Sequence, residues 1–367
     1  MSSALAVVGQ VPHEGLWLEG FSLTACPGGA LLLGGSAWFP DGIGATSRRS
    51  DTALFWEAAT RRWHTLPPMP HPRQAHAAVA LPDGRVLVLG GQSQDAHELR
   101  TTLVWQPEDR RFVEGPPLLA ARSGPVAVRF ADGAVLVLGT DFDDDLERGT
   151  RAELLVPGAS AWVPAGQTAR LFHPGPVCVS GSRVLIAGGR DNGFGFAIVE
   201  GVHFAPPLDQ TTEVWDRERG AWGQLGPLVE SRDEAAGVTL SDGRVLVVGG
   251  WRQGHVLTSA EVWDPRTESW SATGGLATPR SSFALTALPG GRALVSGGLG
   301  ADSKESTAVE CWDPVQGVWS PGTPLRIGRA GHRLVEVAPG RFLVVGCTRT
   351  ATEGLETTWE LWEAAPP

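Results

Sequence analysis

Tyrosine is absent from this chain of 367 residues, and several other features are scarce. There are two methionines, the four cysteines form no CxxC pair, and no apolar run is long enough to span a bilayer. Widely spaced cysteines are typical of reduced thiols, so we expect a cytoplasmic protein. The opening residues MSSALAVVGQ lack the basic and apolar regions of a signal peptide.

A surplus of basic residues is also missing. Lysine and arginine total 30 against 40 aspartates and glutamates, so the formal net charge is −10. Nucleic acids and anionic membranes favour basic protein surfaces. We therefore expect neither nucleic acid nor membrane among the partners.

Glycine, with 48 residues, and tryptophan, with 15, are abundant and recur in a pattern. Runs such as LPDGRVLVLGG and LSDGRVLVVGG join an Asp-Gly turn to an apolar stretch that ends in two glycines. Such turns favour two-residue hairpins between antiparallel strands. The double glycines, at spacings of roughly fifty residues, are Gly34-Gly35, Gly90-Gly91, Gly188-Gly189, Gly249-Gly250 and Gly297-Gly298, with degenerate copies at Gly139-Thr140 and Gly346-Cys347.

A pair of large side chains follows most double glycines at a constant separation of seven residues. The pairs are Trp56/Trp63, Trp105/Phe112, Leu155/Trp162, Trp215/Trp222, Trp263/Trp270 and Trp312/Trp319. We interpret each pair as a third and a fourth strand joined by a turn of fixed length. Each aromatic ring would bury about 150–250 Å² between neighbouring sheets.

The double glycine, the Glu-Val-Trp-Asp-Pro strand end and the second aromatic resemble the kelch repeat family, including its bacterial members, over essentially the whole chain. The resemblance implies an all-β fold: a single seven-bladed kelch-type β-propeller over residues 1–367, with four antiparallel strands per blade. The blades would start near residues 17, 73, 122, 170, 232, 280 and 329.

The last blade has Trp362 in its third strand, but the sequence ends before a fourth strand. In five other blades the fourth-strand aromatic precedes the next blade by ten residues, and the same count back from Trp17 reaches Val7. We therefore predict that residues 4–11 complete the last blade. Such closure removes exposed strand edges.

The connections after the double glycines would share one face of the ring with the joins between blades. We call this the loop-rich face, and variable loops on a rigid scaffold often carry binding residues. The longest loops, SAWFPDGIGATSRRSDTA and RDNGFGFAIVEGVHFAPPLDQTT, are candidates for a lid or a specificity element. Several aromatic side chains on these loops would either stack on a ligand or fold back over their blades, namely Trp38, Phe39, Phe194, Phe196, Phe204 and Trp251.

An arginine opens the inner strand of six blades, and Trp17 takes that place in the first. Guanidinium groups bind carboxylate or phosphate through paired hydrogen bonds. In kelch domains that capture acidic peptides, arginines at this position line the pocket, so the resemblance implies an anion-binding ring. The alternative is structural, with each arginine bonded to carbonyls of a neighbouring blade. The six are Arg73, Arg122, Arg170, Arg232, Arg280 and Arg329.

Metal or cofactor chemistry has little support in the sequence. His76, His173 and His332 each follow an arginine by three residues, but their blades are not adjacent. The acidic run DFDDDLE lacks the glycine and terminal glutamate of a calcium loop. We expect no bound metal and no cofactor.

Three functions remain open, one of which, an assembly hub or a homo-oligomer surface, the sequence neither supports nor removes. The first is a binding protein that recognises an acidic peptide, protein or small organic anion on the loop-rich face. The second is a cofactor-independent isomerase or epimerase, or a natural-product tailoring enzyme, acting on an acidic substrate there. Weak proton-transfer candidates are Glu200, His203, Glu234 and His255, and Cys347 is either a nucleophile or a small buried residue. The resemblance also extends to copper radical oxidases, which need tyrosine ligands that this chain lacks.

Overall fold

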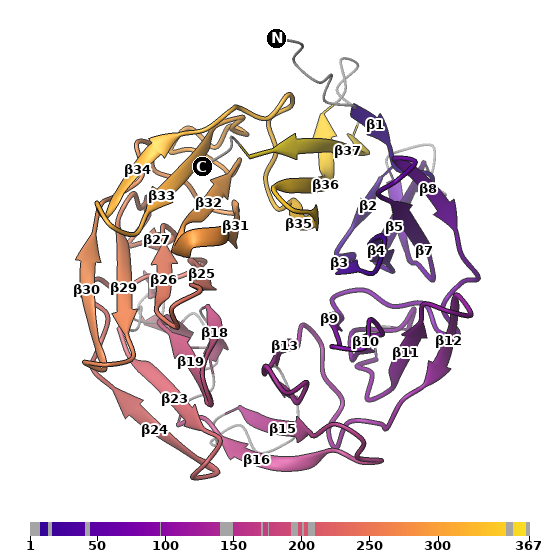
Figure 1. Ribbon diagram of the computed structural model, residues 1–367, viewed down its shortest axis with the longest axis horizontal. Helices are drawn as coiled ribbons and strands as arrows, with labels where there is room; N and C mark the ends of the chain where they lie inside the picture. Colours follow the sequence, from indigo (N-terminus) through magenta and orange to yellow (C-terminus); the bar gives the residue numbers. More distant parts are fainter. Residues whose placement is uncertain are drawn as a thin grey trace.

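A computed structural model provides the structure of the protein. It describes residues 8–13, 17–40, 45–95, 97–139, 150–169, 172–174, 176–191, 197–199, 202–204, 210–349 and 355–364. Within these ranges the chain forms seven four-stranded antiparallel sheets, which we call blades one to seven. Figure 1 shows them arranged around a ring, and their number agrees with the seven blades that the repeat predicts.

The strands of each blade are given from the inside of the ring outward. Blade one has β3 (Ser22–Cys26), β4 (Gly29–Leu33), β7 (Ala53–Glu57) and β8 (Arg62–Thr65). Blade two has β9 (Ala77–Ala80), β10 (Val86–Leu89), β11 (Thr102–Gln106) and β12 (Arg111–Glu114). Blade three has β13 (Val126–Arg129), β14 (Val135–Leu138), β15 (Arg151–Leu155) and β16 (Val163–Gln167). Blade four has β18 (Val177–Ser180), β19 (Arg183–Ala187), β23 (Thr212–Asp216) and β24 (Ala221–Leu225).

The remaining blades follow the same plan. Blade five has β25 (Ala236–Thr239), β26 (Val245–Val248), β29 (Ala260–Asp264) and β30 (Ser269–Thr273). Blade six has β31 (Ala284–Ala287), β32 (Ala293–Ser296), β33 (Val309–Asp313) and β34 (Val318–Pro321), with a 3-10 turn, η1, at Pro289–Gly291. Blade seven has β35 (Arg333–Ala338), β36 (Arg341–Arg349), β37 (Leu355–Glu363) and β1 (Val8–Gln10).

Four small sheets are built from the loops that follow the double glycines or precede the inner strands. In blade one, β2 (Leu18–Glu19) pairs with β5 (Ser36–Pro40), which pairs with β6 (Ala45–Arg49). The others are β17 (Phe172–Pro174) with β20 (Gly189–Asp191), β21 (Ala197–Val199) with β22 (Val202–Phe204), and β27 (Trp251–Arg252) with β28 (His255–Val256). No described helix is long and apolar enough to cross a membrane.

The ring closes through the N-terminal strand, as the spacing predicts. β1 pairs with β37 antiparallel, with Gly9 opposite Trp359, and the Val11 amide donates to the Thr357 carbonyl at 2.9 Å. The two strands lie side by side in Figure 1. Residues 4–7 of the predicted closing segment lie outside the described residues.

The seven-residue spacing of the tryptophans is a cross-strand pairing. Trp215 lies opposite Trp222, and Trp263 lies opposite Trp270, across the third and fourth strands of their blades. The third-strand ring is the more deeply buried, since Trp263 is 0% exposed. Its neighbours include Leu185 and Ala187 of blade four, so the rings pack in apolar layers between blades. This placement confirms their expected role as adhesion between sheets.

The double glycines are needed because the next blade approaches them closely. Gly34 and Gly35 have φ of 61° and 100°, and a Cβ on Gly34 would lie 2.5 Å from the Arg73 carbonyl oxygen of blade two. The Gly35 amide donates to that same oxygen at 2.8 Å. Only glycine combines this backbone conformation with this contact at little cost. Each glycine pair therefore forms part of a joint between consecutive blades.

Candidate functional site

The described arginines at the start of the inner strands do not face solvent. Five are at most 1% exposed, namely Arg73, Arg122, Arg232, Arg280 and Arg329. Each donates a hydrogen bond to the carbonyl of the glycine seventeen residues further on, as Arg232 does to Gly249 at 2.8 Å. The expected ligand-binding ring is therefore wrong for these five residues, and the structural alternative holds. Arg170 lies outside the described residues.

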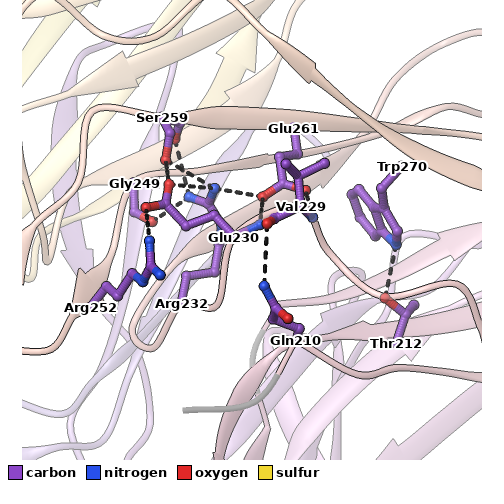
Figure 2. Close-up of polar contacts among 10 residues, drawn as sticks. All are labelled: Gln210, Thr212, Val229, Glu230, Arg232, Gly249, Arg252, Ser259, Glu261 and Trp270. Atoms are coloured by element: carbon purple, nitrogen blue, oxygen red, sulfur yellow. Dashed lines mark hydrogen bonds and ion pairs between the residues drawn. The ribbon is translucent and has the colours of Figure 1, made fainter.

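A buried glutamate of the third strand completes this arrangement in four blades, as Figure 2 shows for Arg232 and Glu261. Glu261 also accepts the backbone amides of Val229 and Glu230 from the segment that leads into the arginine. A desolvated pair of charges is stable only when its other hydrogen-bonding positions are also filled. The ion pairs are Arg122–Glu153 at 2.9 Å, Arg232–Glu261 at 2.8 Å, Arg280–Glu310 at 2.5 Å and Arg329–Glu360 at 3.1 Å. We call this unit the arginine–glutamate plug.

Blade two keeps the arginine but lacks the glutamate. Leu103 stands where five other blades have the carboxylate, and Pro70 stands where the blades with a plug have the first backbone amide that binds it. Arg73 uses the carbonyl and hydroxyl of Thr101 instead, at 3.3 and 3.1 Å. Burial lowers the pKa of Arg73 to about 10. In blade two the glutamate and the backbone amide that would bind it are therefore lost together, while the arginine is kept.

Blade one lacks both parts of the plug. Trp17 takes the arginine position and Leu54 the glutamate position. Trp17 stacks on Trp38 of β5, with ring centroids 5.3 Å apart and planes 12° from parallel. A cavity of about 550 Å³ is lined by Thr52, Ala53 and Leu54, whose counterparts in blade five, Ser259 to Glu261, surround Arg232. The cavity therefore occupies the place of a missing plug, and we call it the blade-one cavity.

The outer wall of the blade-one cavity is the β5–β6 hairpin. Ala37 lies opposite Arg48, and Phe39 opposite Thr46, so these side chains share one face of the hairpin. The Arg48 guanidinium lies 5.4 Å from the centre of the Phe39 ring, and both residues line the cavity. A guanidinium stacked on an aromatic ring keeps its in-plane N–H groups available to a carboxylate. Arg49 donates to the Ser36 hydroxyl at 3.1 Å on the other face.

Further residues line the cavity from the N-terminal segment and from the loop that leads to blade two. They are Pro12, His13, Ser50, Asp51, Thr65, Leu66 and Pro68. Within the described ranges, neither Arg48 nor Arg49 forms an ion pair. The cavity thus combines apolar walls with two arginines and one aspartate, and it suits a ligand that has both an anionic and an apolar part.

The predicted ligand-binding aromatics are only partly brought together. Trp17 and Trp38 stack in blade one, whereas Trp251 is in β27 of blade five, on the opposite part of the ring in Figure 1. Phe194 and Phe196 lie outside the described residues. Arg48 was missed as a binding residue, although it belongs to the first long loop, like Phe39, which the sequence does indicate as a candidate. The sequence did carry a sign of this site: the first repeat has tryptophan at position 17 instead of arginine, and leucine at position 54 instead of glutamate.

The proton-transfer candidates do not form a group in the described structure. Glu234 and His255 are both exposed on blade five. Glu200, and the side chain of His203 in β22, lie outside what the structure describes. Burial raises the pKa of the Cys347 thiol to about 11, and the thiol donates to the Leu18 carbonyl at 3.2 Å. Cys347 is therefore a neutral thiol near pH 7, which fits a structural role better than a nucleophile.

Two of the histidines that follow an arginine by three residues, His76 and His332, are buried and lie apart from each other. His76 bonds the Ser22 hydroxyl and His332 the Ser296 hydroxyl, each at 2.8 Å. The side chain of His173 and the run at 141–147 lie outside the described residues. Among the residues that are described, no three histidine, cysteine, aspartate or glutamate side chains are grouped as a metal site requires.

We expect stability to fall at acid pH because of these two histidines. Burial, and the charge of nearby arginines, lowers the pKa of His76 and of His332 to about 3. Their unfolded pKa is about 6.5, so below that pH the unfolded chain binds protons that the folded one excludes. The free energy of unfolding should drop by about 1.4 kcal/mol per pH unit for each histidine as the pH falls from 6.5 towards 3. Urea unfolding of the wild type and of His332→Gln from pH 7.5 to 5 would measure this. An unchanged slope in His332→Gln would contradict the assignment.

The fold and its joints define the class of the protein: an all-β propeller closed by its own N-terminal strand. Comparison with known proteins shows which kind of propeller the chain is similar to. Residues 235–274, which span blade five, match the family model of the Kelch motif. The fold is similar to that of a kelch-type propeller, described as "Structure of YjhT", with a TM-score of 0.58 and 13% sequence identity over 85% of this chain and 99% of that one. At this identity the likeness shows the fold alone. No curated protein sequence matches the chain.

Proposed function

We propose that this protein is a binding protein that takes a small organic anion in the blade-one cavity. The observation that carries this proposal is the cavity of about 550 Å³ at the position of the missing plug. Binding sites for small molecules typically have volumes of about 300–1,000 Å³ and mostly apolar walls with a few polar groups. Among the residues that the structure describes, five of the other six blades fill the equivalent space with an arginine, and four of these five add a glutamate.

The lining supports a ligand with a carboxylate on an apolar body. The Arg48 guanidinium, which lies over the Phe39 ring, offers paired N–H donors of the kind that bind carboxylates bidentately. Ser50 and Thr52 supply hydroxyls that are bonded to each other at 2.6 Å and can turn to a ligand. Leu54, Leu66 and Pro68 provide apolar surface. The binding role carried over from the sequence is thus assigned to different arginines.

The proposal is tested with benzoate and citrate as probes, by isothermal titration and by thermal shift at constant ionic strength. We expect benzoate to bind, because its ring suits the apolar wall. Arg48→Ala should weaken its binding by about 10- to 100-fold, the loss of a charge-assisted hydrogen-bonding partner. Arg85→Ala is the matched control, since Arg85 is a surface arginine paired with Asp83 in a turn of blade two.

Two results would overturn the proposal. One is that neither benzoate nor citrate binds at millimolar concentration. The other is that Arg48→Ala binds the probe as tightly as the control Arg85→Ala and the wild type do. Should only citrate bind, with the same loss in Arg48→Ala, the anion site stands and the apolar preference is wrong.

A further inference from the structure

The blade-one cavity lies where the two ends of the propeller meet. Leu54, which lines the cavity, belongs to the apolar layer that joins blade one to Leu343 of blade seven. Pro12 and His13 also line the cavity, and they come shortly after β1 in the chain. We call residues 8–13 the N-terminal clasp. Part of the cavity wall is therefore the segment that closes the ring.

A hydrogen bond found at other joints is missing at this one within the described structure. The fourth-strand ring of blades three, four and six donates from Nε1 to a backbone carbonyl of the neighbouring blade or its connection, as Trp222 does to Ala165 at 2.8 Å. The Trp63 ring of blade one packs against the layer shared with blade seven, but its Nε1 is buried without a partner among the described residues. Together with the missing plug, this leaves the joint without two kinds of polar contact that hold other blades together.

The hydrogen bonds of β1 and of the residue after it lead to blade seven. β1 pairs with β37, and the Val11 amide donates to the Thr357 carbonyl at 2.9 Å. Nε2 of Gln10 donates to the Glu356 carboxylate, also at 2.9 Å. Towards blade one, Val11 packs in the apolar layer and is 4% exposed. A ligand that touched both the clasp and blade one would add a polar connection between them.

His13 is the residue of the clasp that suits such a contact. In five other blades the residue four positions before the arginine is a buried leucine or methionine, at most 5% exposed. His13 stands four positions before Trp17, is half-buried and lines the cavity. An imidazole can donate a hydrogen bond to an anion, whereas these apolar side chains cannot. The apolar residues are Met69, Leu118, Leu228, Leu276 and Leu325.

We propose that the ligand of the blade-one cavity bridges blade one and the N-terminal clasp, with one anionic group on Arg48 and a second on His13. This inference rests on the proposed function and narrows the ligand to an apolar body that carries two anionic groups, as a dicarboxylate does. It also couples binding to ring closure. A ligand that contacts the clasp binds best when β1 is in place, so it stabilises the closed ring.

The first test compares terephthalate and isophthalate with benzoate, by isothermal titration at constant ionic strength. Benzoate has a single carboxylate and is the one-ended control. We expect the better dicarboxylate to bind the wild type about tenfold more tightly than benzoate, the effect of a further charge-assisted hydrogen bond. His13→Leu, which restores the residue type of other blades, should remove this difference and leave benzoate binding unchanged. His255→Leu, at an exposed histidine of blade five, is the matched control.

The second test measures backbone hydrogen exchange in the full chain. With the better dicarboxylate at ten times its dissociation constant, amides that exchange when the clasp opens should slow by about tenfold. We expect this for residues 8–11 and not for β30, the outer strand of blade five. Arg48→Ala at the same ligand concentration should show less slowing, because it binds more weakly.

The stability of His13→Leu separates a binding role of this histidine from a structural one. Without ligand, the variant should have a thermal midpoint at least as high as that of the wild type, because leucine supplies the apolar contact found between other blades. A lower midpoint, or a variant that fails to fold, would indicate a structural histidine and overturn the proposal.

Failure of this proposal can be told apart from failure of the proposed function. If benzoate binds through Arg48 but the dicarboxylates bind no more tightly, or keep their advantage in His13→Leu, the bridging is wrong and the anion site stands. Equal slowing of residues 8–11 and of β30 would contradict the coupling to ring closure. If neither dicarboxylate binds, the bridging proposal is wrong whatever benzoate and citrate do.

Discussion

Replacing Arg232 with methionine is expected to lower the free energy of unfolding by about 3–5 kcal/mol, the usual effect of breaking a buried ion pair from one side. Glu261 is 1% exposed and would lose the guanidinium that lies 2.8 Å away. The carbonyls of Gly249 and Ser259 would also lose their donor. Urea unfolding followed by tryptophan fluorescence measures the change.

Two further variants test the reason for that loss. Arg252→Met breaks only the partly exposed pair with Glu230, at 2.9 Å, and should cost about 0–1 kcal/mol. Arg232→Met combined with Glu261→Leu imitates the loss of the carboxylate in blade two and should recover part of the stability. Recovery stays incomplete because the amides of Val229 and Glu230 lose their acceptor. If the double variant were less stable than Arg232→Met, an uncompensated Glu261 would not be the cause.

Deleting residues 1–10 is expected to lower the free energy of unfolding at least as much as Arg232→Met does, because the deletion removes the fourth strand of blade seven. The backbone of β37 would lose its outer partner, which includes the pairing of Val8 with Glu360 and of Gln10 with Thr358. An unpaired edge strand is a template for association with other chains. We therefore expect a lower thermal midpoint together with aggregation, measured by scanning calorimetry and light scattering.

The matched control is a chain that lacks residues 1–7 and so keeps β1. It should behave as the wild type. A substitution gives an independent check within the intact chain: Gly9→Val would place a Cβ 2.7 Å from Nε1 of Trp359 and should cost about 1–3 kcal/mol by overpacking. A chain without residues 1–10 that unfolds at the wild-type temperature would contradict the role of β1 as the closing strand.

Much of the fold could be read from local patterns. The turn signals and the apolar runs predict hairpins, and the constant spacing of Trp215 and Trp222 predicts a cross-strand pair, which the structure contains. The missing strand after Trp362 pointed to the N-terminus for the same reason. These predictions succeed because a strand pair of fixed turn length imposes a fixed spacing on the sequence.

The candidate site was predicted less well. The sequence places Arg232 and its equivalents at the same point of each repeat, and the ring of cations inferred from them was wrong for the five described positions. Whether a guanidinium points to solvent or to a carbonyl depends on what lies beside it. The partner, Glu261, is 29 residues away along the chain, and the significance of Leu54 and Leu103 appears only when the plug is seen as one unit.

By itself the sequence determined the repeat, the hairpin turns and the strand pairing. All three follow from interactions over short and regular separations, which leave a periodic mark on the residues. Only the tertiary structure decided which arginines are buried and where the missing plug leaves a cavity. These depend on desolvation and on contacts between blades, and such contacts join residues whose separation in the chain carries no signal.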